Sequence, residues 1–139
     1  MIWTIIIIIV AVILIKFFID YNKDNYDLQG GTILDKFKHL IQILNDSAFE
    51  GEGRISLTDK RRCNLYKDGA NQIIILNYGT GILTITWRYK YLHKEVVHEK
   101  QYNDVRKISI FEQQKMADLM INEMNQVIEN HQISVLKYI

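Results

Sequence analysis

The segment HKEVVHE, residues 93–99, comes closest to a chemical motif in this chain. Its two histidines and two glutamates are residue types that bind metal ions or exchange protons near neutral pH. His93 and His98 are five positions apart, however, which places them about 140° apart on a helix and on opposite faces of a strand. We therefore expect exposed polar residues of a turn and an edge strand. His93, Glu95, His98 and Glu99 remain the residues of an alternative, enzymatic hypothesis.

Cys63 is the single cysteine and follows Arg61 and Arg62 directly. Neighbouring positive charge lowers the pKa of a thiol and makes it a better nucleophile. A nucleophile pair also needs a base, and the sequence places no histidine beside this cysteine. One cysteine forms neither an internal disulfide nor a cysteine-based zinc site. We expect a small half-buried residue, and we predict no catalytic residue, no metal site, no cofactor and no small-molecule substrate.

Two further segments carry residue types that bind phosphate. NYGTGIL, residues 77–83, contains G-x-G, but a phosphate loop needs a following helix whose N-terminus faces the anion. An alternating strand follows instead, which predicts a hairpin turn. DKRR, residues 59–62, could form a lipid-binding basic patch with Arg88 and Lys90. The expectation for these residues is a solvated polar face.

Aromatic residues Trp87, Tyr89 and Tyr91 alternate with Arg88 and Lys90, as on some sheets that bind single-stranded RNA. Alternation puts the rings and the cations on opposite faces of the strand, so we expect the rings in the core. The chain has 17 Lys+Arg and 16 Asp+Glu, and only Lys16 precedes residue 20, so residues 20–139 carry 16 of each. A nucleic-acid partner is not predicted from such a balance.

The chain begins with MIWTIIIIIVAVILIKFFID, in which only Thr4 interrupts the apolar residues from 2 to 15. A helix that is apolar all round lies in a large core or in lipid, and the rest of this chain is too small to surround it. Residues 2–19 span about 27 Å as a helix, close to the hydrocarbon core of about 30 Å. We predict a single-pass transmembrane anchor at residues 1–19. Its anchor residues are Ile2, Trp3, Ile5, Ile9, Ile13, Lys16, Phe17 and Phe18.

Two alternatives to an anchor are a cleaved signal peptide and a helix buried against a core or partner. A signal peptide needs a basic start and a small-residue cleavage site, and the sequence has only Met1 before the apolar run and no A-x-A-like triplet after it. Lys16 and Lys23 lie at the C-terminal end of the run, which favours a cytoplasmic C-terminal domain. Residues 20–31 are polar and end in Gly-Gly, so we predict a flexible linker that keeps the domain within about 20 Å of the membrane.

Residues 32–139 are predicted to form one globular domain with an amphipathic helix at each end. The first helix starts with a capping box of Thr32 and Asp35 and ends near residues 45–46; the second starts with a capping box of Ser109 and Glu112. The tail at residues 133–139 is apolar and either adds a strand, extends the second helix or docks on a partner. The apolar positions of the helices are Ile33, Phe37, Leu40, Ile41, Leu44, Ala117, Met120, Ile121, Met124, Val127 and Ile128.

Between the helices, three to five antiparallel strands are predicted, at residues 54–58, 63–67, 72–78, 82–91 and 95–102. The last is more polar and is expected at the sheet edge. The fourth alternates, and its apolar face is expected to lie under the helices; that face consists of Leu83, Ile85, Trp87, Tyr89 and Tyr91. The fold class is therefore α+β, with a transmembrane helix followed by a two-layer domain in which a β-meander is flanked by two helices.

Strand 72–78 has apolar side chains at both parities, Ile73 and Ile75 against Ile74 and Leu76. A strand with one solvated face should alternate, so the second sheet face is either covered or an interface. The predicted interface residues are Ile74, Leu76, Tyr78, Ile133, Val135, Leu136 and Tyr138.

The function expected from these features is that of a membrane-tethered, non-enzymatic module that binds another protein or itself, such as a small subunit or assembly factor of a membrane complex. An accessory chaperone or immunity protein is one alternative. An enzyme whose site is not recognisable from sequence is the other.

Overall fold

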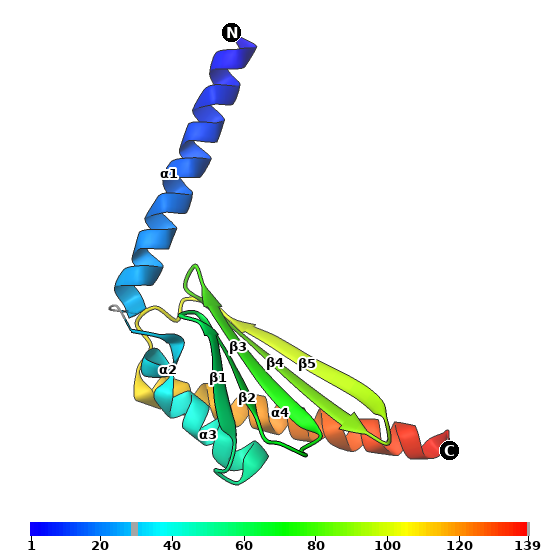
Figure 1. Ribbon diagram of the computed structural model, residues 1–139. Coiled ribbons are helices and arrows are strands. Elements are labelled where there is room, and N and C mark those ends of the chain that lie inside the picture. The colour runs from blue at the N-terminus through cyan, green and yellow to red at the C-terminus, as the bar shows by residue number, and fades with distance from the viewer. Residues whose placement is uncertain (29–30, 139) are drawn as a thin grey trace.

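A long N-terminal helix projects from a compact α+β domain (Figure 1). The structure, a computed structural model, describes the backbone of residues 1–28 and 31–138 and their side chains except those of residues 23–27. The helices are α1 (Ile2–Leu28), α2 (Ile33–Lys36), α3 (Lys38–Phe49) and α4 (Ile110–Lys137). The strands are β1 (Arg54–Asp59), β2 (Arg62–Tyr66), β3 (Gln72–Gly79), β4 (Ile82–Tyr91) and β5 (Lys94–Tyr102). The predicted α+β class is confirmed.

The five strands form one antiparallel meander in the order β1-β2-β3-β4-β5. Two-residue turns join β3 to β4 at Thr80–Gly81 and β4 to β5 at Leu92–His93, and all four residues have positive φ, from 49° to 73°. This turn geometry matches the right-handed twist of paired strands. It also fixes the register, because Gly79 then pairs with Ile82. The more polar β5 lies at the sheet edge, as predicted.

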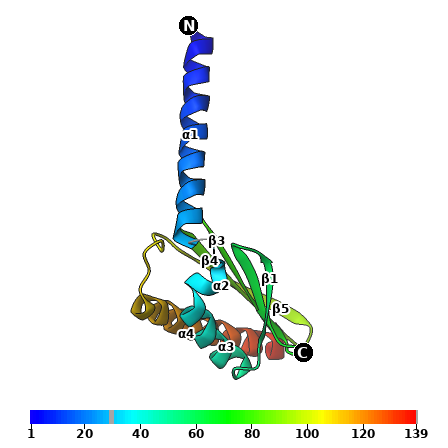
Figure 2. The ribbon, with the colours of Figure 1, turned by 60° about the vertical axis from the view of Figure 1, so that its left-hand side comes forward.

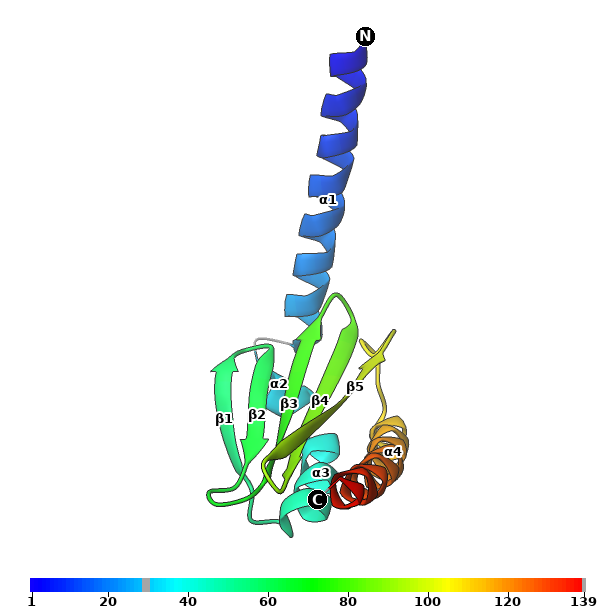
Figure 3. The same ribbon diagram turned by 90° about the vertical axis from the view of Figure 1, so that its right-hand side faces the viewer.

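Helices α3 and α4 pack together on one face of the sheet (Figures 2 and 3). Alternation along β4 supplies the facing core, since Leu83, Ile85, Trp87 and Tyr89 are buried, while Tyr91 is half-buried. The predicted apolar residues of the first helix are also buried, and Phe37 packs edge-to-face on Tyr78 with ring centroids 5.5 Å apart. Of the predicted stripe on α4, Ala117, Met120 and Met124 are buried and Ile121, Val127 and Ile128 are half-buried. The predicted two layers are confirmed.

The first predicted helix is broken at Phe37 into α2 and α3, and α3 continues to Phe49 instead of ending near residue 46. A break leaves backbone groups without helical partners. The side chain of Gln113 on α4 provides partners for two of these groups. Its oxygen accepts from Leu40 N at 3.1 Å, and its amide nitrogen donates to Lys36 O at 3.0 Å. Gln113 is only 5% exposed. The kink therefore depends on a side chain 73 residues away in the sequence.

The prediction of a flexible linker over residues 20–31 needs correction, because α1 remains helical to Leu28. Residues 20–28 contain neither glycine nor proline, so nothing in this stretch interrupts the helix. Leu28 is 6% exposed and belongs to the domain core. Residues 29 and 30 of the predicted linker lie outside the described residues. The apolar helix is thus joined to the domain by further helix and by a buried contact.

Candidate interaction surfaces

The apolar half of α1 has no covering in the structure. Its segment Ile2–Asn22 is long and apolar enough to cross a membrane, and none of its most hydrophobic window is buried. Trp3 is 78% exposed and Phe17 is 64% exposed. At 1.5 Å per residue, the 21 residues of this segment span about 31 Å, which matches a bilayer core. Apart from Lys16, the predicted anchor residues are apolar and exposed, which suits a helix surrounded by lipid.

Where α1 reaches the domain, it contacts the turn between β1 and β2. The Arg61 guanidinium lies 5.1 Å from the centre of the Tyr21 ring, a cation–π contact. The turn is fixed on its other side as well, because Lys60 O accepts from Ile33 N at 2.7 Å and Arg61 O accepts from Tyr78 N at 2.8 Å. Asp35 caps α2 by accepting from Thr32 N at 2.9 Å, as the capping box predicts. The end of α1, the start of α2 and this turn form one junction.

The sheet face turned away from the helices is called the open face here. Two cross-strand rows run across its middle: Tyr66, Ile73, Arg88 and Val97 in one, and Asn64, Ile75, Thr86 and Glu99 in the other. Ile73 and Ile75 are half-buried by their neighbours, and Val97 is 48% exposed. No helix in the described part of the chain covers these rows (Figure 3). The apolar members Ile73, Ile75 and Val97 are called the apolar centre; it is small, and the polar or charged residues of the same rows lie beside it.

Polar groups of both charge signs surround this centre. Arg88 Nε and Glu95 Oε1 form an ion pair at 2.7 Å, and Thr86 Oγ1 donates to Glu99 at 2.8 Å. At the end far from α1, the open face is hollowed by a shallow pocket of about 460 Å³ between the β2–β3 turn and Arg88. Protein–protein interfaces commonly have an apolar centre and a polar rim. Apolar residues scattered singly over a surface do not have this arrangement.

The predicted interface residues of β3 lie on the other side of the sheet. Ile74, Leu76 and Tyr78 are at most 1% exposed. They pair with Trp87, Ile85 and Leu83 and share their core face. These three residues therefore belong to the core, and the residues of β3 on the open face include Ile73 and Ile75. The signal that identifies the correct parity is the two-residue turn, because it aligns Tyr78 with Leu83.

The apolar tail extends α4, which is one of the three predicted alternatives. Its last turns are tied to the sheet, since Gln132 Nε2 donates to the Tyr89 hydroxyl at 2.8 Å and His131 Nε2 lies 2.9 Å from Lys94 O. Val135 is buried. Ile139 lies outside the described residues. The remaining predicted interface residues of the tail are exposed: Ile133, Leu136 and Tyr138.

The side chains of the enzymatic hypothesis do not converge. Glu95 and Glu99 lie on the open face in the ion pair and hydrogen bond given above, whereas His93 lies in a turn. His98 lies on the helix side, with its Nε2 3.0 Å from Glu123 of α4. Among the described residues no group of three potential metal ligands occurs. The segment 93–99 is therefore distributed over both faces of the sheet, as its odd histidine spacing indicates.

The ion cluster around Glu123 connects β5 to α4. Lys100 Nζ lies 2.6 Å from Glu123 Oε1. Hydrogen bonds from Lys100 and then His98 lower the pKa of the Glu123 carboxyl. Burial, followed by the charge of Glu123, raises the pKa of Tyr102 to about 12. These groups stabilise the docking of the helix on the edge strand.

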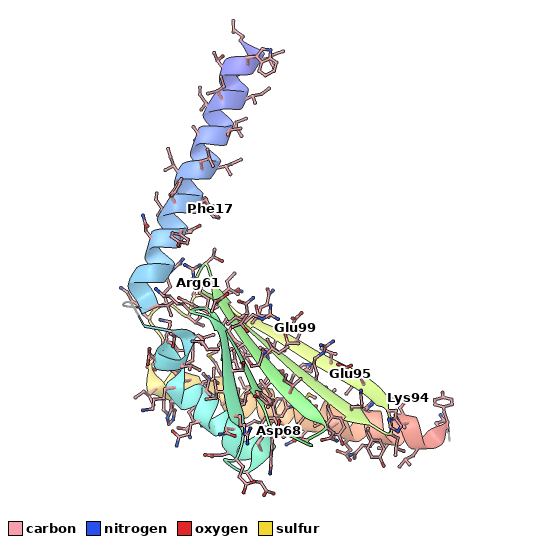
Figure 4. The ribbon with its side chains drawn as sticks, viewed as in Figure 1. Phe17, Arg61, Asp68, Lys94, Glu95 and Glu99 are labelled. Atoms are coloured by element: carbon pink, nitrogen blue, oxygen red, sulfur yellow. The ribbon has the colours of Figure 1, made fainter. Side chains whose placement is uncertain are left out.

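The structure also shows where the other candidate residues lie: Cys63, the G-x-G segment and the residues of the basic patch. Cys63 is fully buried instead of half-buried, and burial raises the pKa of its thiol to about 11, which is the opposite of activation. Residues 77–83 form the predicted hairpin turn. The proposed basic patch does not form, because residues 59–62 lie at the end next to α1 and Lys90 lies beside the opposite turn. Figure 4 shows Arg61 next to α1 and Lys94 at the far end.

Comparison of the chain with protein-family models, with curated proteins and with solved structures finds no match. Its class is therefore defined by its own architecture, an α+β domain carrying one helix that is long and apolar enough to span a membrane.

Proposed function

We propose that the protein is a single-pass membrane protein whose open face binds another protein held at the same membrane. The observation that carries this proposal is the one-sided sheet. The helices bury the side chains that β2, β3 and β4 direct to one face, and the other face keeps a small apolar centre, Ile73, Ile75 and Val97, within a polar rim. Glu95 and Glu99 of the open face lie on the side of the sheet from which α1 projects (Figure 4), so a neighbour anchored in the same bilayer is within reach of this face.

The junction ties the end of α1 to the domain, because Tyr21 contacts Arg61 and Leu28 is part of the core. Retention of the segment before Tyr21 is supported by the sequence, which has no A-x-A-like triplet after the apolar run. The helix that leaves the membrane is therefore also a packing element of the domain. Lys16 and Lys23 at its C-terminal end favour a cytoplasmic domain.

Retention is tested by extracting membranes with alkaline carbonate and measuring the intact mass of the full chain. The expected result is a chain that stays in the membrane fraction and begins at Met1. A soluble species that starts near residue 20 would contradict the proposed anchor.

Partner binding is tested by photo-crosslinking in the membranes of cells that produce the protein. The photoreactive residue p-benzoylphenylalanine replaces Val97 on the open face or, as a control, Leu119 on α4, whose exposed fractions are similar at 48% and 44%. We expect a discrete adduct from position 97 only, which is lost when Ile75→Glu places a charge in the centre of the open face. An adduct of twice the chain mass would identify a second copy as the partner. No adduct from position 97, or the same adducts from both positions, would contradict the proposal.

A further inference from the structure

We infer that the β1–β2 turn, residues 59–62, binds the headgroups of anionic phospholipids and holds the domain against the membrane surface. This inference rests on the membrane anchor of the proposed function. It concerns a surface distinct from the open face.

The position of the turn follows from its contact with α1. The segment that is long and apolar enough to span a membrane ends at Asn22, so in the proposed anchor Tyr21 lies at the boundary of the hydrocarbon core. The headgroup layer beyond this boundary is about 5–7 Å thick. Because the Arg61 guanidinium is 5.1 Å from the Tyr21 ring, the turn lies at the level of the headgroups.

The charge of the turn suits anionic headgroups. Lys60, Arg61 and Arg62 are consecutive, and Lys60 and Arg62 are exposed. The one acidic residue of the turn, Asp59, directs its carboxylate to the backbone, where Oδ1 accepts from Arg61 N at 2.7 Å. Two exposed cations therefore project from a membrane-level turn whose acidic side chain is engaged within the turn itself.

The backbone of the turn is held in place, so its side chains are presented in a fixed direction. The carbonyls of Lys60 and Arg61 accept hydrogen bonds from α2 and β3, respectively. An irregularity in the register between Leu57 and Asp59 bends β1 just before the turn. Each Lys or Arg held close to an anionic leaflet favours the bound position by about fivefold.

The test measures how closely the turn approaches the lipid headgroups. A nitroxide is attached through Thr58→Cys in the full chain, since Thr58 is exposed and the native Cys63 is fully buried. The chain is placed in nanodiscs of phosphatidylcholine alone or with phosphatidylglycerol. Power-saturation electron paramagnetic resonance then measures collisions with a nickel-chelating lipid headgroup. We expect at least about twofold higher accessibility in the anionic discs, and a reduction of this difference in high salt.

Two charge-reversal variants separate this surface from a general effect of charge. The double variant Lys60→Glu and Arg62→Glu is expected to give the same accessibility in both kinds of disc. The control Lys90→Glu and Lys94→Glu changes the net charge equally at the far end of the domain and is expected to behave as wild type. Circular dichroism in the same discs checks that both variants are folded.

Each other outcome overturns the inference. Equal accessibility of the wild-type chain in both lipids would mean that α1 alone sets the distance. If both double variants lost the accessibility difference between the two kinds of disc equally, the net charge of the domain, and not the β1–β2 turn, would cause the effect. If the dependence on Lys60 and Arg62 appeared only in native membranes, an acidic protein would be the ligand of the turn. A chain that leaves the nanodisc entirely would instead refute the anchor, so the two failures are distinguishable.

Discussion

Gln113→Ala is predicted to destabilise the domain far more than the same substitution at an exposed glutamine of α4. The wild-type side chain satisfies Leu40 N and Lys36 O at the break between α2 and α3, and it is 5% exposed. Leaving a buried backbone donor or acceptor unpaired costs about 1–3 kcal/mol. For the two groups together we expect a loss of about 2–4 kcal/mol.

The assay is urea unfolding of the full chain in detergent micelles, followed by Trp87 fluorescence in a Trp3→Phe background. With a slope of about 2 kcal/mol/M, in the middle of the usual range for small proteins, the midpoint should fall by about 1–2 M. Gln114→Ala is the matched control, because it makes the same substitution at the adjacent exposed position. That control should change stability by less than about 0.5 kcal/mol.

Gln113→Met distinguishes hydrogen bonding from packing, since it keeps the volume of the side chain but neither of its hydrogen bonds. We expect most of the loss to remain. A Gln113→Met variant as stable as the wild type would refute the reasoning, because the break would then need only a filled space.

The remaining predictions concern a thiol, an ion cluster and a turn. Cys63 should react with maleimide at pH 8 no faster than the chain unfolds, because its thiol is buried and its pKa is about 11; rapid labelling of the folded chain would show an open core. Because the pKa of Glu123 is lowered in the folded state, its ionised carboxylate stabilises the domain at pH values above the ordinary pKa of 4.5, and this stability is lost as the pH falls through the folded-state pKa. Glu123→Gln should therefore make the urea midpoint less dependent on acid pH. An unchanged pH dependence would show that the Glu123 cluster does not stabilise the domain. Gly81→Ala should cost about 1–2 kcal/mol, because φ is +73° and the new Cβ would lie 2.8 Å from Arg106; Gly79→Ala meets no atom within 4 Å and should cost clearly less in the same urea titration.

Local patterns in the sequence predict most of the domain. Alternation along β4 identifies the core face, and both capping boxes mark where helices begin, because these signals involve residues close together in the chain. The break at Phe37 is not predictable in this way. It depends on Gln113. A polar residue on an amphipathic helix is expected to be exposed, so the sequence does not indicate that Gln113 is buried and bonds to Leu40, 73 residues away.

The open face shows where sequence reasoning stops short. The excess of apolar residues in β3 correctly indicates two apolar faces, but pattern alone does not say which parity faces the helices. That choice depends on register, and the Thr80–Gly81 turn fixes it by pairing Tyr78 with Leu83. Similarly, the polar composition after residue 20 suggests a linker, whereas the absence of helix-breaking residues keeps α1 helical to Leu28.

The most direct test of the proposed interaction is the accessibility of the open face in native membranes. Val97→Cys is labelled with a membrane-impermeant maleimide in opened native membranes and in nanodiscs that contain only the purified chain, with Leu119→Cys as the exposed control. We expect position 97 to be protected in native membranes and reactive in nanodiscs, while position 119 reacts in both. Equal and rapid labelling of position 97 in both preparations would contradict the claim that this face binds another protein at the membrane.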